Sequence, residues 1–261
     1  RCYIQKPRTT VGWMGPLNQP DPYAAADLEA GIYYCRKMMI ELLKLGYALA
    51  DEALFTHNDS YFVDLLSWIA IGARSCEDQE HRIFASMIPH SVGIKNSTSG
   101  HIGVGINSII AAQHRHTFAF HGNQIKTSGN PYAHLILRGG AGKPNCDENS
   151  MLKATRLLAA QDIQNPAIII DASHENSVHD GAKDPLIQPQ VVRDVLACRA
   201  QNPELQKSIK GFMMESFLQD GKQNLKDATC AEDLQSGKSI TDGCLGIDKT
   251  IEFLRALYTD L

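Results

Sequence analysis

Several cationic side chains stand where they could bind an anionic ligand. They are Arg1, Lys6, Arg8, Arg74, Lys95 and Arg138. Guanidinium and ammonium groups bind phosphate and carboxylate through charge-assisted hydrogen bonds. So many like charges can be buried together only against an anion, and phosphate or carboxylate is the natural choice. The alternative is that several of them are surface residues paired with acids.

A second set of residues has the chemistry of metal ligands. It consists of His174, Glu215 and Asp242. One imidazole and two carboxylates suit Mn²⁺, Fe²⁺ or Zn²⁺. Tens of residues separate the three, so their spacing alone is also consistent with unrelated polar residues, and only the fold can bring them together.

The elements that must position these residues follow an alternating pattern. Short β-rich runs alternate with longer helical patterns, which predicts βα units around a parallel sheet. The predicted strands cover residues 2–5, 48–52, 68–73, 91–95, 117–120, 167–171 and 211–215, with an extra strand at 134–137. The predicted helices cover residues 28–45, 147–160, 190–200 and 250–258.

The candidate residues fall at or beyond the ends of predicted strands. In a parallel α/β barrel, the C-terminal ends of the strands carry the chemistry. The residues found there are Lys6, Arg8, Glu52, Arg74, Lys95, Arg138, His174 and Glu215, and Asp242 lies in the loop at 237–243. We therefore expect cations and metal-type ligands to collect at one rim of the fold.

This pattern predicts an α/β fold of the (β/α)8 TIM-barrel type, forming a single catalytic domain over residues 1–261. Its length suits such a barrel, which commonly has about 250 residues. A closed barrel needs eight strands and we count seven. We expect that the first barrel strand is absent from the given chain, so that the domain is N-terminally incomplete, and that an extra hairpin strand accompanies the barrel.

Composition excludes several classes of function. The formal net charge of −4 lacks the basic excess on which non-specific binding to DNA or RNA depends, so we expect no nucleic-acid partner. No apolar run approaches the roughly 18 residues of a membrane span, so we expect no membrane insertion. Seven scattered cysteines without a CxxC pair fit reduced thiols and a cytoplasmic location.

Seven short motifs occur in order along the chain. They are KPRTTVGW at 6–13, GAR at 72–74, GIKN at 93–96, LRGG at 137–140, DASHENS at 171–177, MES at 214–216 and GKSITD at 237–242. Together they closely resemble the class I 3-deoxy-D-arabino-heptulosonate 7-phosphate (DAHP) synthases, of the type inhibited by aromatic amino acids. The resemblance covers nearly the whole chain.

The resemblance implies an enzyme, a 3-deoxy-7-phosphoheptulonate synthase. Such an enzyme performs a metal-dependent, aldol-type condensation of phosphoenolpyruvate with erythrose 4-phosphate, the first step of the shikimate pathway, and releases phosphate. It also implies a divalent metal cofactor (Mn, Fe or Zn) and a homodimer or homotetramer. Two phosphates and a carboxylate need several cations, so the inference from the residues agrees with it.

The resemblance also implies roles for single residues. Carried over by motif, the phosphoenolpyruvate site comprises Arg1, Ala73, Arg74, Lys95 and Arg138, with Glu52 close by and Lys6 shared between the substrates. Arg8 and Thr9 would bind erythrose 4-phosphate. His174, Glu215 and Asp242 would bind the metal, with Asp242 also near substrate. The catalytic residues would be Lys6, Arg74, Lys95 and His174.

The sequence departs from the family in three places. The family's cysteine ligand on the first barrel strand is absent, which we attribute to an N-terminal segment missing from the given chain. Met14 stands where the family has a lysine, so we expect weaker affinity for phosphate. The segment 120–129 is short, so we do not expect inhibition by phenylalanine or tyrosine. The alternative is a non-catalytic or repurposed homologue that binds sugar phosphates or uses another aldehyde phosphate.

Overall fold

The computed structural model describes residues 1–7 and 11–260. The chain divides into two compact units. The first unit comprises Arg1–Ser97, His101–Ile136 and Leu158–Pro166, and the second comprises Thr98–Gly100, Leu137–Leu157 and Ala167–Leu261. Parallel strands and helices occur in both units, which confirms the α/β class. The single domain over 1–261 stays a prediction.

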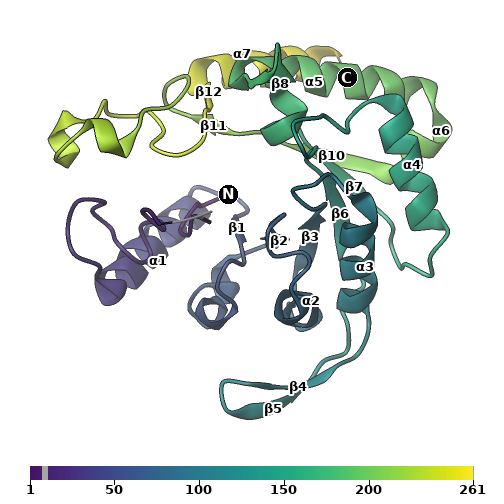
Figure 1. Cartoon of the computed structure of the whole chain (residues 1–261), viewed down its shortest axis with the longest axis horizontal. Helices are drawn as coiled ribbons and strands as arrows, with labels where there is room; N and C mark the ends of the chain where they lie inside the picture. The colour runs from purple at the N-terminus through teal and green to yellow at the C-terminus, as the bar shows by residue number, and fades with distance from the viewer. Residues whose placement is uncertain (8–10, 261) are drawn as a thin grey trace. The chain divides into compact units, whose positions relative to one another are not determined.

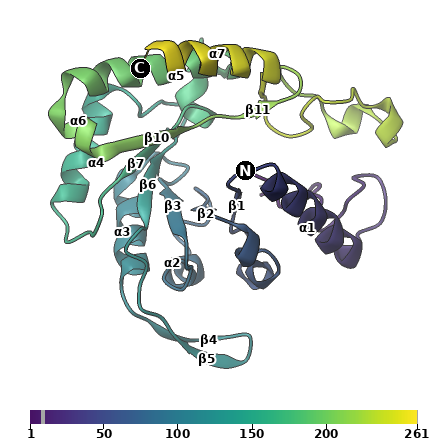
Figure 2. The same cartoon turned by 180° about the vertical axis from the view of Figure 1, so that it is seen from behind.

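A parallel sheet forms the centre of the first unit. Its strands run in the order β1 (Ala50–Glu52), β2 (Trp68–Ile71), β3 (Ser91–Lys95) and β6 (His134–Leu137), the last of which ends at the boundary of the unit. Figure 1 and Figure 2 show β1, β2 and β3 side by side in that order. Their residues are almost all buried, as expected of a parallel sheet covered on both faces.

Three α-helices belong to the first unit. They are α1 (Leu28–Lys44), α2 (Gln79–Ala85) and α3 (Ile102–Gln113). Helix α1 begins where the side chain of Asp27 accepts a hydrogen bond from the Ala30 amide, the usual N-cap arrangement. It buries Gly31, Cys35 and Met39, which lie four residues apart and therefore on one face. The predicted helix over 28–45 is confirmed, whereas α2 was not predicted.

The strand predicted over residues 117–120 is present, but its predicted place in the parallel sheet is wrong. Residues 117–120 form β4 (Thr117–Phe120), which pairs antiparallel with β5 (Asn123–Lys126) in a hairpin, and the parallel strand is 134–137 instead. The reason is burial. The residues of β4 alternate between exposed and half-buried, as on one side of a hairpin, while every residue of β6 is buried. The expected extra hairpin strand is therefore β4.

The predicted strand over residues 2–5 is also wrong. The segment is irregular, although the Cys2 amide donates to the Ala50 carbonyl at 2.8 Å. On its other side, Ile4 accepts from the Leu17 amide and Lys6 donates to Met14. The segment pairs with a loop there, and these bonds do not extend into a ladder.

The second unit contains its own parallel strands. β7 (Ile168–Asp171) pairs parallel with β10 (Ile209–Met213), and β11 (Ser216–Phe217) with β12 (Leu245–Gly246). β8 (Val178–His179) and β9 (Ala182–Lys183) form a short antiparallel hairpin. The helices are α4 (Glu148–Ala159), α5 (Gln188–Gln201), α6 (Pro203–Ser208) and α7 (Ile247–Asp260).

The core of the second unit lies under α5 and α7. Ala172, Val191, Val192 and Phe253 are buried together there, and Phe212 and Met214 pack against them. Burial of these apolar side chains holds the end of β10 against the two helices. Because Met214 precedes Glu215, this packing fixes the point at which a candidate site residue leaves the strand.

Short 3₁₀ turns complete the elements of the chain. They are η1 (Thr56–Tyr61), η2 (Val63–Leu65), η3 (His174–Ser177), η4 (Pro185–Ile187), η5 (Leu225–Asp227) and η6 (Ala231–Asp233). All seven cysteines are free thiols, as predicted. Within residues 1–7 and 11–260, no helix has the length and apolar character needed to cross a membrane.

Candidate active site

The strand ends carry the predicted residues in both units. In the first, Glu52 closes β1, Arg74 follows β2 by three residues, and Lys95 closes β3. In the second, His174 follows β7 by three residues and Glu215 follows β10 by two. Because the C-terminal ends of hydrogen-bonded parallel strands meet at one edge, each unit gathers its candidates at an edge of its own strands.

Two acids neutralise Arg1 in the first unit. Its Nη2 lies 2.8 Å from Oε2 of Glu52, and its Nε lies 3.6 Å from Oδ1 of Asp51. Both carboxylates are almost completely buried. Burial raises the pKa of Asp51 to about 6, and the positive charge of Arg1 offsets only part of this rise. Arg1 is therefore already paired with two buried acids.

A close backbone approach places Glu52. A Cβ on Gly72 would collide with the Glu52 carboxylate, so the glycine of the Gly72-Ala73-Arg74 motif makes room for this acid. Ala73 is half-buried and Arg74 is exposed. Across the described part of the chain, no ion pair to Arg74 is formed. Its charge is therefore available to a ligand.

The two predicted lysines of the first unit are buried. Lys6 is 8% exposed and Lys95 is 3% exposed. The Lys6 ammonium lies 5.0 Å from the ring centroid of Tyr3, and the Arg1 guanidinium lies 4.1 Å from the same ring. Cation–π attraction stabilises both charges there. The other predicted residues of this segment, Arg8 and Thr9, lie outside the described residues.

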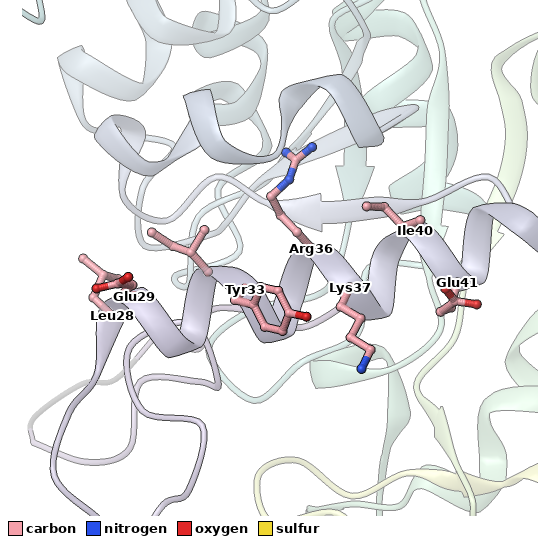
Figure 3. A pocket seen from close by; sticks show the side chains of 8 residues that line it. Leu28, Glu29, Tyr33, Arg36, Lys37, Ile40 and Glu41 are labelled. Carbon is pink, nitrogen blue, oxygen red and sulfur yellow. The ribbon is translucent and has the colours of Figure 1, made fainter.

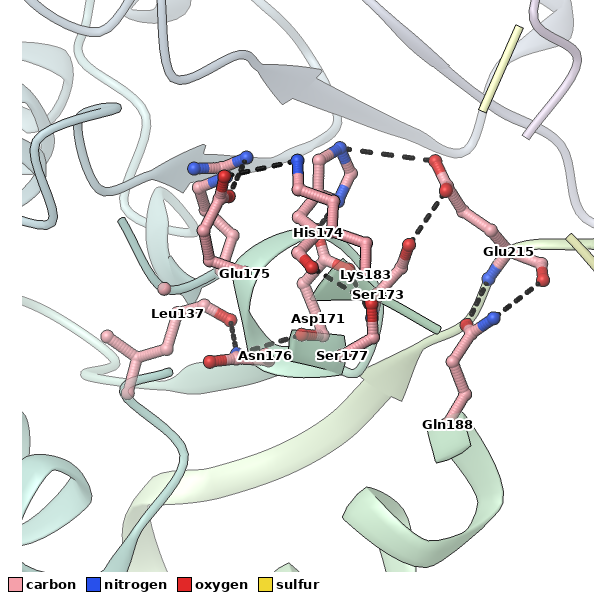
Figure 4. A network of polar contacts seen from close by, with 12 residues as sticks. Leu137, Asp171, Ser173, His174, Glu175, Asn176, Ser177, Lys183, Gln188 and Glu215 are labelled. Atoms are coloured by element: carbon pink, nitrogen blue, oxygen red, sulfur yellow. Dashed lines mark hydrogen bonds and ion pairs between the residues drawn. The ribbon is translucent and has the colours of Figure 1, made fainter. Parts of the chain in front are cut away.

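In the second unit, His174 lies between two carboxylates (Figure 4). Its Nδ1 lies 2.9 Å from Oδ2 of Asp171, which is fully buried. Its Nε2 lies 4.0 Å from Oε1 of Glu215. A carboxylate at Nδ1 favours the tautomer that carries its proton there, which leaves the Nε2 lone pair available to a metal. His174 has a φ of +53°, in the left-handed region that non-glycine residues seldom occupy and that is often found at functional sites.

Hydrogen bonds hold Glu215 in place. The hydroxyl of Ser173 donates to its Oε2 at 2.7 Å. The side chain of Gln188, at the start of α5, accepts from the Glu215 amide at 2.7 Å and donates to its carbonyl at 3.0 Å. The carboxylate is thus fixed through both its side chain and its backbone, with Oε1 directed to His174 (Figure 4).

Arg138 is paired with a residue that we did not predict. Its Nη2 lies 2.6 Å from Oε2 of Glu175, whose Oε1 lies 3.1 Å from Nζ of Lys183. Burial alone would raise the pKa of Glu175, but Arg138 and then Lys183 lower it below the usual value. Glu175 and Asp171 both belong to the DASHENS motif. Their closeness to His174 in the sequence is the signal that could have identified them as site residues.

The structure gathers part of the predicted metal set. His174 and Glu215 lie close together, while Asp242 is half-buried in the loop after β11. Among residues 1–7 and 11–260, no group of three or more His, Cys, Asp or Glu side chains is arranged to hold a metal. The imidazole and carboxylate that are present, with Asp171 behind the imidazole, have donor chemistry that fits Mn²⁺, Fe²⁺ or Zn²⁺.

A surface groove lies along α1, away from the predicted site residues. Its lining includes Leu28, Tyr33, Lys37, Ile40 and Glu41, all on one helix (Figure 3). Within the described ranges, the lining contains none of the predicted site residues. We therefore place the candidate site at the strand ends.

Comparison with known proteins identifies the group to which this arrangement belongs. The DAHP synthetase I family matches residues 1–255. The Tyr-sensitive phospho-2-dehydro-3-deoxyheptonate aldolase of Escherichia coli is 37% identical, over 100% of this chain and 72% of the relative. The phospho-2-dehydro-3-deoxyheptonate aldolase of Corynebacterium glutamicum is 37% identical, over 98% of this chain and 70% of the relative.

A solved structure agrees with these relatives. The phospho-2-dehydro-3-deoxyheptonate aldolase of Francisella tularensis matches this chain with a TM-score of 0.87 and 34% sequence identity. The match covers 98% of this chain and 72% of the other. A family match over most of the chain, relatives above 30% identity and a similar fold lead to one conclusion. The chain belongs to the DAHP synthetase I family.

Proposed function

We propose that the chain is a 3-deoxy-7-phosphoheptulonate synthase. It would condense phosphoenolpyruvate with erythrose 4-phosphate to give DAHP and phosphate, as the first step of the shikimate pathway. The observation that carries this proposal is family membership over residues 1–255. The cations and metal-type ligands at the strand ends of both units support it, because both substrates are anionic and the reaction is an aldol-type addition.

The cations would bind the substrates. We assign Arg1, Ala73, Arg74, Lys95 and Arg138 to phosphoenolpyruvate, with Glu52 beside it and Lys6 shared between the substrates. Arg8 and Thr9 are assigned to erythrose 4-phosphate. The low exposure of Lys6, Lys95 and Arg138 supports their assignment to the substrates, because a cation shielded from water binds an anion more strongly than an exposed one.

His174 and Glu215 would hold a divalent metal, with Asp242 proposed as a further ligand. Such a metal, when bound, polarises the aldehyde carbonyl of erythrose 4-phosphate. The Asp171 carboxylate, 2.9 Å from Nδ1 of His174, would favour a proton on Nδ1, and Ser173 and Gln188 keep Glu215 oriented. The lysines and arginines orient phosphoenolpyruvate so that its C3 attacks the aldehyde carbon. Water then adds to C2 and the C2–O bond to phosphate breaks.

A coupled assay tests the proposal. The purified chain is supplied with both substrates and Mn²⁺, and phosphate release and DAHP formation are both measured. We expect both products in equal amounts and their loss after removal of the metal with a chelator. A folded, metal-loaded chain that binds phosphoenolpyruvate without turnover would contradict the proposal and favour a non-catalytic homologue. Turnover only with another aldehyde phosphate would identify a repurposed enzyme.

Three broader properties are also proposed. We infer a (β/α)8-type barrel as a single domain, supported by the fold similarity to the Francisella tularensis protein. An experimental structure of the protein tests this. A homodimer or homotetramer rests on the family resemblance, and light scattering tests it. A cytoplasmic location rests on the seven cysteine thiols, and cell fractionation tests it.

A further inference from the structure

Glu175 is shared by two cations in the second unit. Its carboxylate contacts Arg138 through one oxygen, at 2.6 Å, and Lys183 through the other, at 3.1 Å. The side chains of Arg138 and Glu175 are 8% and 15% exposed, whereas that of Lys183 is 53% exposed. Figure 4 shows the carboxylate of Glu175 directed to the same side as His174 and Glu215. The acid is therefore part of the site region.

The backbone of Glu175 is attached to the strand end that carries Arg138. The Glu175 amide donates to the Arg138 carbonyl at 3.2 Å, and the Asn176 side chain donates to the Leu137 carbonyl at 3.1 Å. At Gly139, φ is +73° and a Cβ would lie only 2.6 Å from Cβ of Glu175. These contacts leave Glu175 little freedom to move away from Arg138.

The charges of the group favour an anionic ligand. One carboxylate stands between two cations, so the three side chains keep a net positive charge. With one acid shared between Arg138 and Lys183, the group can attract phosphate or carboxylate.

We propose that Glu175 is a positioning residue that holds the guanidinium of Arg138 ready for an anionic group of the substrate. The proposal deepens the function proposed above and rests on it for the identity of the substrate, phosphoenolpyruvate. A free arginine side chain loses rotamer entropy when a ligand fixes it. A guanidinium already fixed by Glu175 avoids that cost at the moment of binding, which strengthens binding without a new contact to the ligand.

The test is a double-mutant cycle on anion binding. Calorimetry measures the Kd of phosphoenolpyruvate and of inorganic phosphate for the metal-loaded chain, for Glu175→Gln, for Arg138→Met and for the double variant. We expect Glu175→Gln to weaken binding of both anions about tenfold in the original chain. We expect less than about a twofold effect once Arg138 is replaced, because Glu175 acts through Arg138.

Two further variants keep the result interpretable. Glu175→Asp retains the charge on a shorter side chain, and we expect it to weaken binding about threefold. If Glu175→Gln does not fold, Glu175→Asp takes its place in the double-mutant cycle. Glu204→Gln removes the same charge from an exposed pair with Arg156 in the same unit, and we expect no change in either Kd.

The outcomes separate this inference from the proposed function. Tighter binding in Glu175→Gln would overturn the inference, because Glu175 would then compete with the ligand. An equal effect in both Arg138 backgrounds would also overturn it, since the role would then be merely structural. If the chain binds phosphate and the cycle shows coupling, but no DAHP forms, the proposed function fails and the inference stands. A chain that binds neither anion overturns both.

Discussion

The two units treat their buried acids in opposite ways. In the first, Asp51 and Glu52 both pair with Arg1, and burial raises the pKa of Asp51 to about 6. In the second, Glu175 lies between Arg138 and Lys183, and its pKa is lowered although it too is partly buried. Asp51 is more deeply buried than Glu175, and burial together with the neighbouring cations decides the direction of each shift.

The comparison also separates cations by their availability. Arg1 and Arg138 are both paired with acids, whereas Arg74 is exposed and its charge is not offset by a described ion pair. A paired cation contributes to stability as well as to binding, and an unpaired one contributes to binding alone. Variants of these residues can therefore test which role each has.

The largest expected effect concerns His174. His174→Asn removes the Nε2 lone pair that would bind the metal beside Glu215. We expect kcat of the synthase reaction to fall by roughly 10³-fold. The control is His179→Asn, because His179 is an exposed histidine in the adjacent hairpin. Equal activity of the His174 variant and the original chain would show that the second unit contributes no catalytic histidine at this position.

Loss of Arg138 should affect both stability and affinity. Arg138→Met leaves the Glu175 carboxylate with only the half-exposed Lys183, and we expect the free energy of unfolding to fall by about 3 kcal/mol. Urea unfolding followed by circular dichroism measures this. An unchanged free energy of unfolding, with only weaker substrate binding, would show that Arg138 behaves like Arg74. The distinction between paired and unpaired cations would then be wrong.

Asp51 gives a pH dependence whose sign can be worked out. Its pKa is raised from 3.8 to about 6 in the folded state, so the folded chain binds more protons than the unfolded chain between these values. Its contribution to stability is therefore complete below about pH 3.8 and is lost as the pH rises through about 6. At pH 7 the ionised acid costs on the order of 3 kcal/mol.

Asp51→Asn should remove that dependence. Relative to the variant, the original chain should lose stability between pH 4 and pH 7. Both tryptophans, Trp13 and Trp68, lie in the first unit, so their fluorescence reports urea unfolding there. A stability difference that is constant over this pH range, or that increases with pH, would mean that Asp51 is ionised in the folded state throughout. The two units would then not differ as described.

The smallest effect is expected for Arg74. Arg74→Met should raise the KM for phosphoenolpyruvate about tenfold, because one charge-assisted contact is lost. Its free energy of unfolding should change by less than about 0.5 kcal/mol, because the side chain is exposed. A large loss of stability would show that Arg74 is held by the protein, as Arg138 is.

The strand ends were the most predictable part of the site. Glu52, Lys95 and Glu215 were placed correctly because apolar runs that end in a charged residue predict buried strands that end at a polar edge. The wrong assignments, at 2–5 and 117–120, concern short runs whose composition suits a hairpin or an irregular segment as well as a parallel strand. Their true state depends on which chain segment lies beside them.

The pairing of the site residues could not be predicted. Arg138 and Glu175 are 37 residues apart and Arg1 and Asp51 are 50 apart, so their approach depends on how the strands are brought together. Asp242 was predicted from its motif alone. Among the described residues, no group of three potential ligands brings it together with His174 and Glu215.

The sequence alone determined the α/β class, the principal helices, and the residue types at the strand ends, because these depend on local patterns of apolar and polar residues. It also determined the family, through the order of its motifs. Only the tertiary structure decided which acid neutralises which cation, and in which direction each pKa moves. Coulombic attraction and desolvation depend on distance and burial in three dimensions, and neither is encoded in the spacing of residues along the chain.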